Sequence, residues 1–248
     1  MVLDTHAHLA DLPEGVVEKA KAVGLTGIVA VSANLPTCEG TLKLAKEHRG
    51  YVHAALGVHP TEFFDQSLEA ACEIIRVNAC ECVAVGEIGL DYWHKLVRKN
   101  AAMKERQLEF YIRQLQVARE VNLPVSIHSR GAWEDCIELA CSHGSGRGVF
   151  HWYSGPLDVL DRVLDAGYYV SCTPAVEVSS ELRAAMAKAP LDRILIETDS
   201  PVWIKSLGRE SEPADVQLTL RHLAELKGLP MADVDVTTTR NAETLFKL

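Results

Sequence analysis

The sequence predicts an α/β protein of the (β/α)8 TIM-barrel class. Short apolar runs alternate with helical patterns from one end of the chain to the other, and a run recurs about every 20–40 residues. The length of 248 residues suits one barrel, and a doubly wound α/β sheet is the main alternative. Eight strands are expected, over residues 2–9, 27–33, 52–60, 82–92, 124–130, 148–155, 168–174 and 194–201.

The composition of these runs supports parallel strands. Several are rich in Val and Ile and end at a Gly, a Pro or a polar residue, as in GIVAVSA at 27–33 and PVSIHSR at 124–130. Strands buried on both faces have this near-continuous apolar character. We therefore expect a parallel sheet that is covered by helices.

The segments between the runs have the apolar spacing of helices. Apolar residues recur at steps of three or four in 103–121, in 133–140 and in 157–164, and Gly167 is expected to end the last of these helices. The polar start of the 91–123 connection predicts a short excursion over the barrel top before its helix. Further helices are expected after residue 213, with apolar faces at Leu218, Leu220, Leu223, Leu226 and Phe246.

Composition and charge limit the function classes. Hydrophobic residues make up 48% of the chain, and no linker or low-complexity tract interrupts it, so one domain over 1–248 is expected. No apolar run has the length of about 18 residues that spans a bilayer. The net charge of −9 argues against a basic surface that grips duplex DNA. Bound divalent cations can still invert the charge of a local site.

The cysteines are interpreted as structural thiols. The seven are odd in number and scattered, and most lie among aliphatic residues. Cys80 and Cys82 form a C-x-C pair without the two-pair spacing of a zinc site. This usage predicts a reducing, cytoplasmic environment.

Histidines and carboxylates at strand ends are the chemically informative pattern. Asp4, His6 and His8 alternate along the first strand and so project to one face, which in a barrel points inward at the mouth. Parallel strands place their carboxyl ends together, where barrel enzymes have their sites. Imidazole and carboxylate are ligands of divalent metal ions. The sequence therefore predicts a metal centre built from His6, His8, Glu87, His128, His151 and Asp199.

Each of these residues also has an ordinary structural interpretation. A lone strand histidine is commonly a hydrogen-bonded core residue, and Glu87 could cap a helix or pair with a lysine. Asp199, followed by Ser200 and Pro201, has the composition of a helix start. Six separate coincidences at strand ends explain the pattern less well than one shared metal centre.

The motifs resemble a known family. H-x-H on the first strand, with the later carboxylates and histidines, is similar to the amidohydrolase-like metal-dependent hydrolase superfamily. Within it, the chain resembles the TatD family of metal-dependent deoxyribonucleases over essentially its whole length, from the first strand to RNAETLF near the end. The blocks that carry the resemblance are DTHAHL, GVHP, GEIGLDY, PVSIHSR, HWYSG and ETDSP.

The resemblance implies the chemistry of the site. The family's metal ligands fall on the six predicted residues, and Glu87 would lie between two divalent ions (Mg²⁺, Mn²⁺ or Zn²⁺). The resemblance also implies a soluble cytoplasmic protein. The chain departs from the family pattern at three places on the rim. Trp152-Tyr153 replaces the usual Cys-Phe, an aromatic is common at Val202, and an Asn is common near 211–213. These departures bear on substrate shape and leave the metal set intact.

Other residues near the mouth receive separate interpretations. His59 is expected either to contact a phosphate or to hydrogen-bond a loop, and the guanidinium of Arg130 suits a phosphate oxygen pair. Glu197 lies deeper than Asp199 and is expected to support the site, whereas Asp91 is expected to order its turn. Residues 94–106 are either a positive rim for a nucleic-acid backbone or a solvated helix entry.

The expected function is hydrolysis of phosphodiester bonds at single-stranded or frayed DNA ends by a monomeric enzyme. Divalent ions lower the pKa of a bound water toward about 7. Asp199, as ligand and base, would accept the proton, with Glu87 as the second catalytic carboxylate. Alternatives are hydrolysis of a small-molecule ester, amide or phosphoester, hydrolysis of aminoacyl-tRNA esters, and a non-enzymatic metal-binding scaffold.

Overall fold

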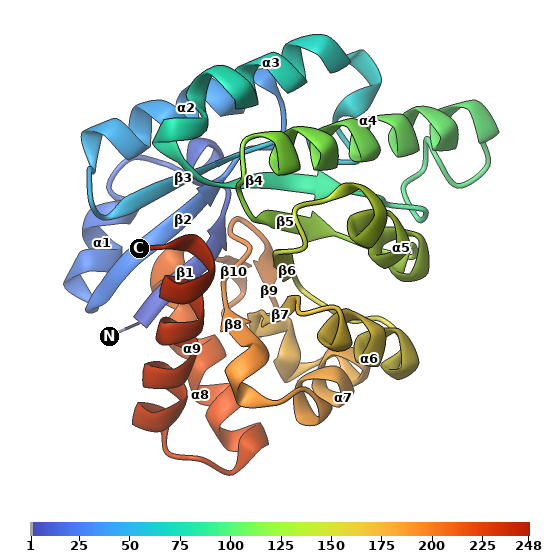
Figure 1. Cartoon of the computed structure of the whole chain (residues 1–248). Coiled ribbons are helices and arrows are strands. Elements are labelled where there is room, and N and C mark those ends of the chain that lie inside the picture. The colour runs from blue at the N-terminus through green and yellow to red at the C-terminus, as the bar shows by residue number, and fades with distance from the viewer. Residues whose placement is uncertain (1) are drawn as a thin grey trace.

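Eight parallel strands form a barrel whose order around the sheet is the order along the chain (Figure 1). The computed structural model describes residues 2–248. The predicted TIM-barrel class is confirmed, and the doubly wound alternative is wrong because the strand order does not reverse. The strands are β1 (Val2–Ala7), β2 (Leu25–Val31), β3 (Val52–Leu56), β4 (Cys82–Gly89), β5 (Val125–His128), β6 (Gly148–Phe150), β7 (Tyr169–Cys172) and β8 (Ile194–Ile196).

Helices surround the barrel and bury their apolar faces against it (Figure 1). The helices are α1 (Val16–Ala22), α2 (Leu35–Glu47), α3 (Leu68–Asn78), α4 (Ala101–Glu120), α5 (Trp133–His143), α6 (Leu157–Asp165), α7 (Ser180–Lys188), α8 (Val216–Lys227) and α9 (Met231–Phe246). Short 3-10 turns occupy Leu9–Asp11, Phe63–Asp65, Ala79–Glu81, Pro174–Glu177, Leu191–Arg193 and Pro213–Asp215.

The predicted apolar helix faces are largely confirmed. In α4, Tyr111, Leu115 and Ala118 are fully buried, which places the stripe of that helix on the sheet. In α6, Val163 is buried, but Leu157 is 41% exposed. The prediction for Leu157 is wrong, because this residue is the first of the helix and lies at its exposed end.

The region after β8 differs from expectation. The strand ends at Ile196, so Asp199 lies beyond it and not within it. A small antiparallel hairpin follows, formed by β9 (Trp203–Ile204) and β10 (Arg209–Glu210), and the next long helix begins only at Val216. The interpretation of Asp199 as a helix cap is therefore wrong. The polar segment from 91 to 100 does form the expected excursion before α4.

Backbone contacts between the two ends of the sheet close the barrel. The Asp199 amide donates to the His6 carbonyl at 2.9 Å, and the His8 amide donates to the Ser200 carbonyl at 2.7 Å. Deeper inside, the buried carboxyl of Asp4 accepts hydrogen bonds from Thr198, at 2.9 Å from the amide and 2.6 Å from the hydroxyl. The seam between β1 and the segment after β8 thus consists largely of polar contacts.

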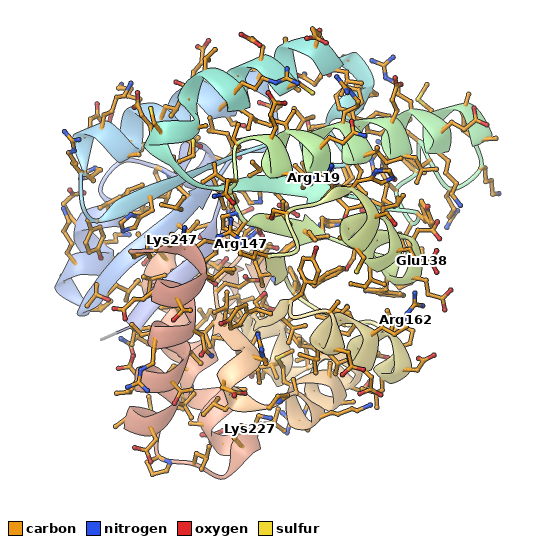
Figure 2. All side chains as sticks on the ribbon, in the orientation of Figure 1. Arg119, Glu138, Arg147, Arg162, Lys227 and Lys247 are labelled. Atoms are coloured by element: carbon orange, nitrogen blue, oxygen red, sulfur yellow. The ribbon has the colours of Figure 1, made fainter. Side chains whose placement is uncertain are left out.

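The outer surface has charged side chains on its helices. Figure 2 shows Glu138 of α5 and Arg162 of α6, which form an ion pair of 3.1 Å. Arg147, which precedes β6, donates to the Asn122 carbonyl at 2.8 Å (Figure 2). Within residues 2–248, no helix combines the length and apolar content that crossing a bilayer requires.

The seam yields a prediction about stability. Thr198→Val removes the hydroxyl that donates to Asp4 and leaves a buried carboxyl oxygen without that partner. We expect the free energy of unfolding to fall by about 1–3 kcal/mol, as measured by urea denaturation. The control is Thr244→Val, whose exposed hydroxyl bonds only within α9 and whose effect should stay within about 0.5 kcal/mol. If both changes lower the free energy of unfolding equally, the seam contact contributes no more to stability than an exposed hydroxyl does.

Candidate metal centre

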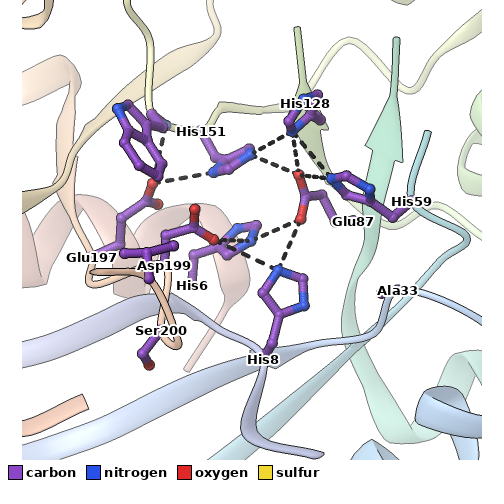
Figure 3. A network of polar contacts seen from close by, with 12 residues as sticks. His6, His8, Ala33, His59, Glu87, His128, His151, Glu197, Asp199 and Ser200 are labelled. Carbon is purple, nitrogen blue, oxygen red and sulfur yellow. Dashed lines mark hydrogen bonds and ion pairs between the residues drawn. The ribbon is translucent and has the colours of Figure 1, made fainter. Parts of the chain in front are cut away.

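The six residues predicted to bind metal lie together at the carboxyl ends of the strands (Figure 3). His6 lies within β1 and Glu87 within β4, while His128 is the last residue of β5. The other three lie just past a strand end: His8 after β1, His151 after β6 and Asp199 after β8. Residues spread along almost the whole chain therefore meet at one place.

The Glu87 carboxylate lies at the centre of the cluster and faces imidazoles on both sides (Figure 3). Its Oε2 atom lies 3.1 Å from Nε2 of His6 and 3.2 Å from Nε2 of His8. Its Oε1 atom lies 2.8 Å from Nδ1 of His128 and 2.7 Å from Nε2 of His151. The interpretations of Glu87 as a helix cap or a lysine partner are therefore wrong.

Asp199 adds a second carboxylate to the His6 and His8 side. Its Oδ1 atom lies 3.5 Å from Nε2 of His6 and 3.6 Å from Nε2 of His8. The residue has a positive φ of 51°, a conformation that few non-glycine residues adopt. The hydrogen bond that the Asp199 amide donates to the His6 carbonyl holds it there, so the barrel seam directly positions the carboxylate.

Partners on the far side of the rings fix the orientation of two imidazoles. His6 Nδ1 lies 3.1 Å from the Ser126 hydroxyl, and His151 Nδ1 lies 3.3 Å from Oε1 of Glu197. Such partners set which ring nitrogen is free to bind a metal. Glu197 is fully buried, which agrees with the supporting position expected from the sequence.

His59 lies in the cluster more deeply than the sequence indicated. Its Nε2 atom is 3.2 Å from Oε1 of Glu87 and 3.3 Å from Nδ1 of His128. Its Nδ1 atom contacts the loop residue Thr61, with the hydroxyl at 2.7 Å. The loop contact expected for His59 is therefore present, but the contact with Glu87 was missed. The available signal was that His59, like His8, His151 and Asp199, lies just past the end of a strand.

Arg130 lies on the wall of the pocket above the cluster. Its guanidinium contacts Oδ2 of Asp91 at 2.7 Å, and its side chain is 51% exposed. Asp91 also accepts hydrogen bonds from the amides of Trp93 and His94, both at 3.0 Å, so its expected role in ordering the turn is confirmed. The ion pair holds Arg130 where its exposed half can meet a ligand.

The electrostatics of the cluster follow from its burial and its opposite charges. Burial raises the pKa of Glu87, but His151, His59 and His6 together hold that pKa well below its usual range. Burial lowers the pKa of His8, but contacts with Asp199 and Glu87 outweigh this effect and raise it to about 10. For His59, burial dominates and lowers the pKa to about 4.

The donor set fits divalent metal ions. Two groups of residues share Glu87, and within each group the possible ligand atoms all lie within 4.8 Å of one another. The first group is His6, His8, Glu87 and Asp199, and the second is His59, Glu87 and His128. Imidazole nitrogens with carboxylate oxygens suit Zn²⁺, Mn²⁺ and related ions. The fold and this donor set define the class of metal-dependent hydrolase barrels.

Comparison with known proteins agrees with this class. The family model described as TatD related DNase matches residues 3–247. The "Uncharacterized metal-dependent hydrolase YabD" of Bacillus subtilis is 34% identical, over 100% of this chain and 100% of that protein. The human "Deoxyribonuclease TATDN3" is 32% identical, over 99% of this chain and 94% of that protein.

A solved structure supports the same assignment. The crystal structure of YJJV, a TatD homologue from Escherichia coli K12, has a TM-score of 0.90 and 28% identity, and the match covers 100% of this chain and 98% of that one. This chain belongs to the TatD family. The two relatives named above are described as a metal-dependent hydrolase and a deoxyribonuclease. The resemblance inferred from the sequence motifs is confirmed.

The pKa of His8 yields a prediction about metal binding. A metal-bound imidazole must be neutral, so an ion has to displace the proton that His8 holds up to about pH 10. We expect binding of Mn²⁺ or Zn²⁺ to tighten about tenfold per pH unit for each proton released. Calorimetric titration between about pH 6.5 and 10 measures both the affinity and the number of protons released.

The same shift predicts the pH dependence of stability without metal. Because the folded pKa of His8 exceeds the ordinary 6.5, its stabilising contribution is complete below about pH 6.5 and is lost as the pH rises toward 10. The unfolding midpoint of chelator-treated protein should fall over this range, and His8→Gln should remove the His8 share of that fall. Despite burial, which lowers them, the pKa values of His128 and His151 are also raised, by contacts with Asp91 and Glu87 and by the charge of Glu87, so part of the fall should remain. His53→Gln, near the amino end of β3, is the control. A metal affinity that does not change with pH would contradict both expectations.

Proposed function

We propose that the chain is a metal-dependent deoxyribonuclease that hydrolyses phosphodiester bonds at single-stranded or frayed DNA ends. The single observation that supports this most is the Glu87 carboxylate, which turns one oxygen toward His6 and His8 and the other toward His128 and His151. A carboxylate shared in this way suits two ions side by side, an arrangement typical of enzymes that cleave phosphodiesters.

The proposed ligands form two sets. His6, His8, Glu87 and Asp199 would hold one ion, and Glu87, His128 and His151 would hold the other, with His59 beside them. When bound, such divalent cations would lower the pKa of a coordinated water and stabilise negative charge on a phosphate. Mg²⁺, Mn²⁺ and Zn²⁺ are the proposed candidates.

Asp199 is the proposed proton acceptor. Burial raises the pKa of its carboxyl, but the hydrogen bond with His8 and the charges of His151 and His6 hold that pKa below its usual range. The carboxylate is therefore ionised at neutral pH and able to accept a proton. Its residue is 8% exposed and lines the pocket, so substrate can reach it.

Arg130 is the proposed phosphate contact. Its guanidinium is held by Asp91 on one side, and 51% of the side chain remains exposed beside the pocket. A planar guanidinium matches the oxygen pair of a phosphate. His59 lines the same pocket, and we propose that it also contacts the substrate.

The shape of the pocket supports a chain end over a continuous duplex as substrate. The cavity above the metal centre has a volume of about 510 Å³, within the range of about 300–1,000 Å³ that is common for small ligands. A nucleotide separated from its neighbours fits such a cavity. The net charge of −9 also argues against non-specific binding along a duplex.

A substrate panel tests the proposal. Single-stranded DNA with an internal label, the matching duplex, RNA, and panels of carboxylic esters, amides and phosphomonoesters are compared with Mg²⁺ or Mn²⁺ present. We expect the single strand to be shortened from an end, with loss of activity on chelation and recovery when metal is restored. If an ester or amide is hydrolysed and the DNA strands stay intact, the small-molecule alternative is favoured instead.

Asp199→Asn separates metal binding from proton transfer. Asn keeps the shape and one oxygen ligand but cannot accept the proton, so kcat should fall by about 10²–10⁴-fold while most of the metal remains. The measurements are metal content and kcat on one labelled DNA strand. Asp192→Asn, an exposed carboxylate at the other end of β8, is the control. Near-normal turnover in a metal-replete Asp199→Asn protein would exclude Asp199 as the base.

The basic segment at 94–106 yields a prediction about salt. Two of its cations have partners within the chain: Lys104 lies 3.8 Å over the Tyr92 ring, and Arg106 donates to the Gln66 carbonyl at 3.0 Å. The side chains that remain for a DNA backbone are exposed: Lys95, Arg98 and Lys99.

Replacement of these three residues by Gln should weaken DNA binding and reduce the slope of log affinity against log salt by about two. The matched control neutralises the same number of charges on α2 and the turn after it, with Lys43, Lys46 and Arg49 changed to Gln. A salt slope that does not change would identify 94–106 as a solvated helix entry.

A further inference from the structure

Three of the four tryptophans of the chain line the pocket over the metal centre. Trp93 follows β4 and is 59% exposed, Trp133 begins α5, and Trp152 is the residue after His151. The rings of Trp93 and Trp133 meet edge to face, with centroids 5.6 Å apart. We call these three residues the aromatic wall.

Two glycines leave room for the indoles of the aromatic wall. A Cβ atom at Gly131 would lie 2.5 Å from Nε1 of Trp93, and a Cβ atom at Gly155 would lie 2.6 Å from Cγ of Trp133. Gly131 also has a positive φ of 71°. A side chain at either position would displace an indole, so the observed positions of Trp93 and Trp133 require glycine at Gly131 and Gly155.

The backbone of Trp152 is held in an uncommon conformation. Its φ is 42°, which is rare for a bulky residue. Its amide donates to the Ser171 hydroxyl at 2.8 Å and to Oε1 of Glu197 at 3.0 Å. Both partners are fully buried. Such a conformation, held by buried groups beside an active site, indicates that the position of the side chain matters for function.

The wall and the metal centre together match the two parts of a nucleotide. Cations and Arg130 suit the phosphate, whereas an exposed indole face suits a flat base, because stacking on aromatic side chains does not depend on base identity. A base inside a duplex is already stacked on its neighbours and is not free to meet an indole.

We propose that the aromatic wall stacks against the base of the nucleotide whose phosphate lies at the metal centre, and that this contact selects unstacked bases. The inference rests on the proposed deoxyribonuclease function. It assigns a specificity role to Trp152 and Trp93, while Trp133 supports the edge of Trp93.

The test compares two single-stranded oligonucleotides that differ only at their ends. One has normal terminal nucleotides, and the other has an abasic nucleotide at each end. We expect wild-type kcat/KM to be about 5- to 150-fold higher on the normal strand, the range that corresponds to loss of one base–aromatic stack. Trp152→Leu should lose most of this preference, because the substitution lowers kcat/KM more on the normal strand than on the abasic strand.

Three further variants separate stacking from folding. Trp152→Phe retains an aromatic face and should keep most of the preference. Trp93→Leu should reduce it, and this change is at an exposed side chain, so it serves if Trp152→Leu does not fold. Trp203→Leu, at a 67% exposed residue of β9 outside the pocket lining, should leave the preference unchanged. Metal content and the unfolding midpoint verify each protein.

The outcomes distinguish the wall from the proposed function. If the wild type shortens both strands equally well, or if Trp152→Leu and Trp93→Leu lose activity equally on both, the wall does not bind a base. If the wild type hydrolyses neither strand with metal present, the deoxyribonuclease function itself is wrong, and the stacking role is overturned with it.

Discussion

The burial of one carboxylate, that of Glu87, constrains the rest of the site. A buried charge is costly unless opposite charges and hydrogen bonds surround it. Imidazole nitrogens from four other strand ends lie between 2.7 and 3.2 Å from its two oxygens. The carboxylate in turn stabilises the close packing of the histidines, because His128 lies only 3.3 Å from both His59 and His151. The carboxyl ends of these strands are thus fixed relative to one another by one side chain.

The contacts that close the barrel are also the contacts that complete the site. The Asp199 amide bonds to the His6 carbonyl, so two proposed metal ligands are joined through the backbone at the seam. Below them Thr198 bonds to Asp4, and on the other side Glu197 contacts both His151 and the Trp152 amide. The same four-residue segment, Glu197 to Ser200, therefore contributes both to barrel closure and to the proposed site, and changes there should affect both.

Strand period and strand polarity were enough to predict the barrel and the meeting of six side chains. His6 and His8 share a face because side chains alternate, and parallel strands bring Glu87, His128, His151 and Asp199 to the same mouth. What depends on loops could not be predicted. Spacing gave no signal for the β9–β10 hairpin, for the pairing of Arg130 with Asp91 or for the approach of Trp93 to Trp133, because each joins segments whose path is set by tertiary packing.

The first and last strands of the barrel meet at the seam, and this has a consequence for how the protein is made. A ribosome releases β1, with His6 and His8, long before it releases Asp199 and Ser200. Until the last strand arrives, β1 lacks one of its neighbours and the cluster lacks its second carboxylate. Domains fold as units once their chain is available. The candidate metal centre, which barrel closure completes, therefore forms only after the segment that follows β8 has left the ribosome.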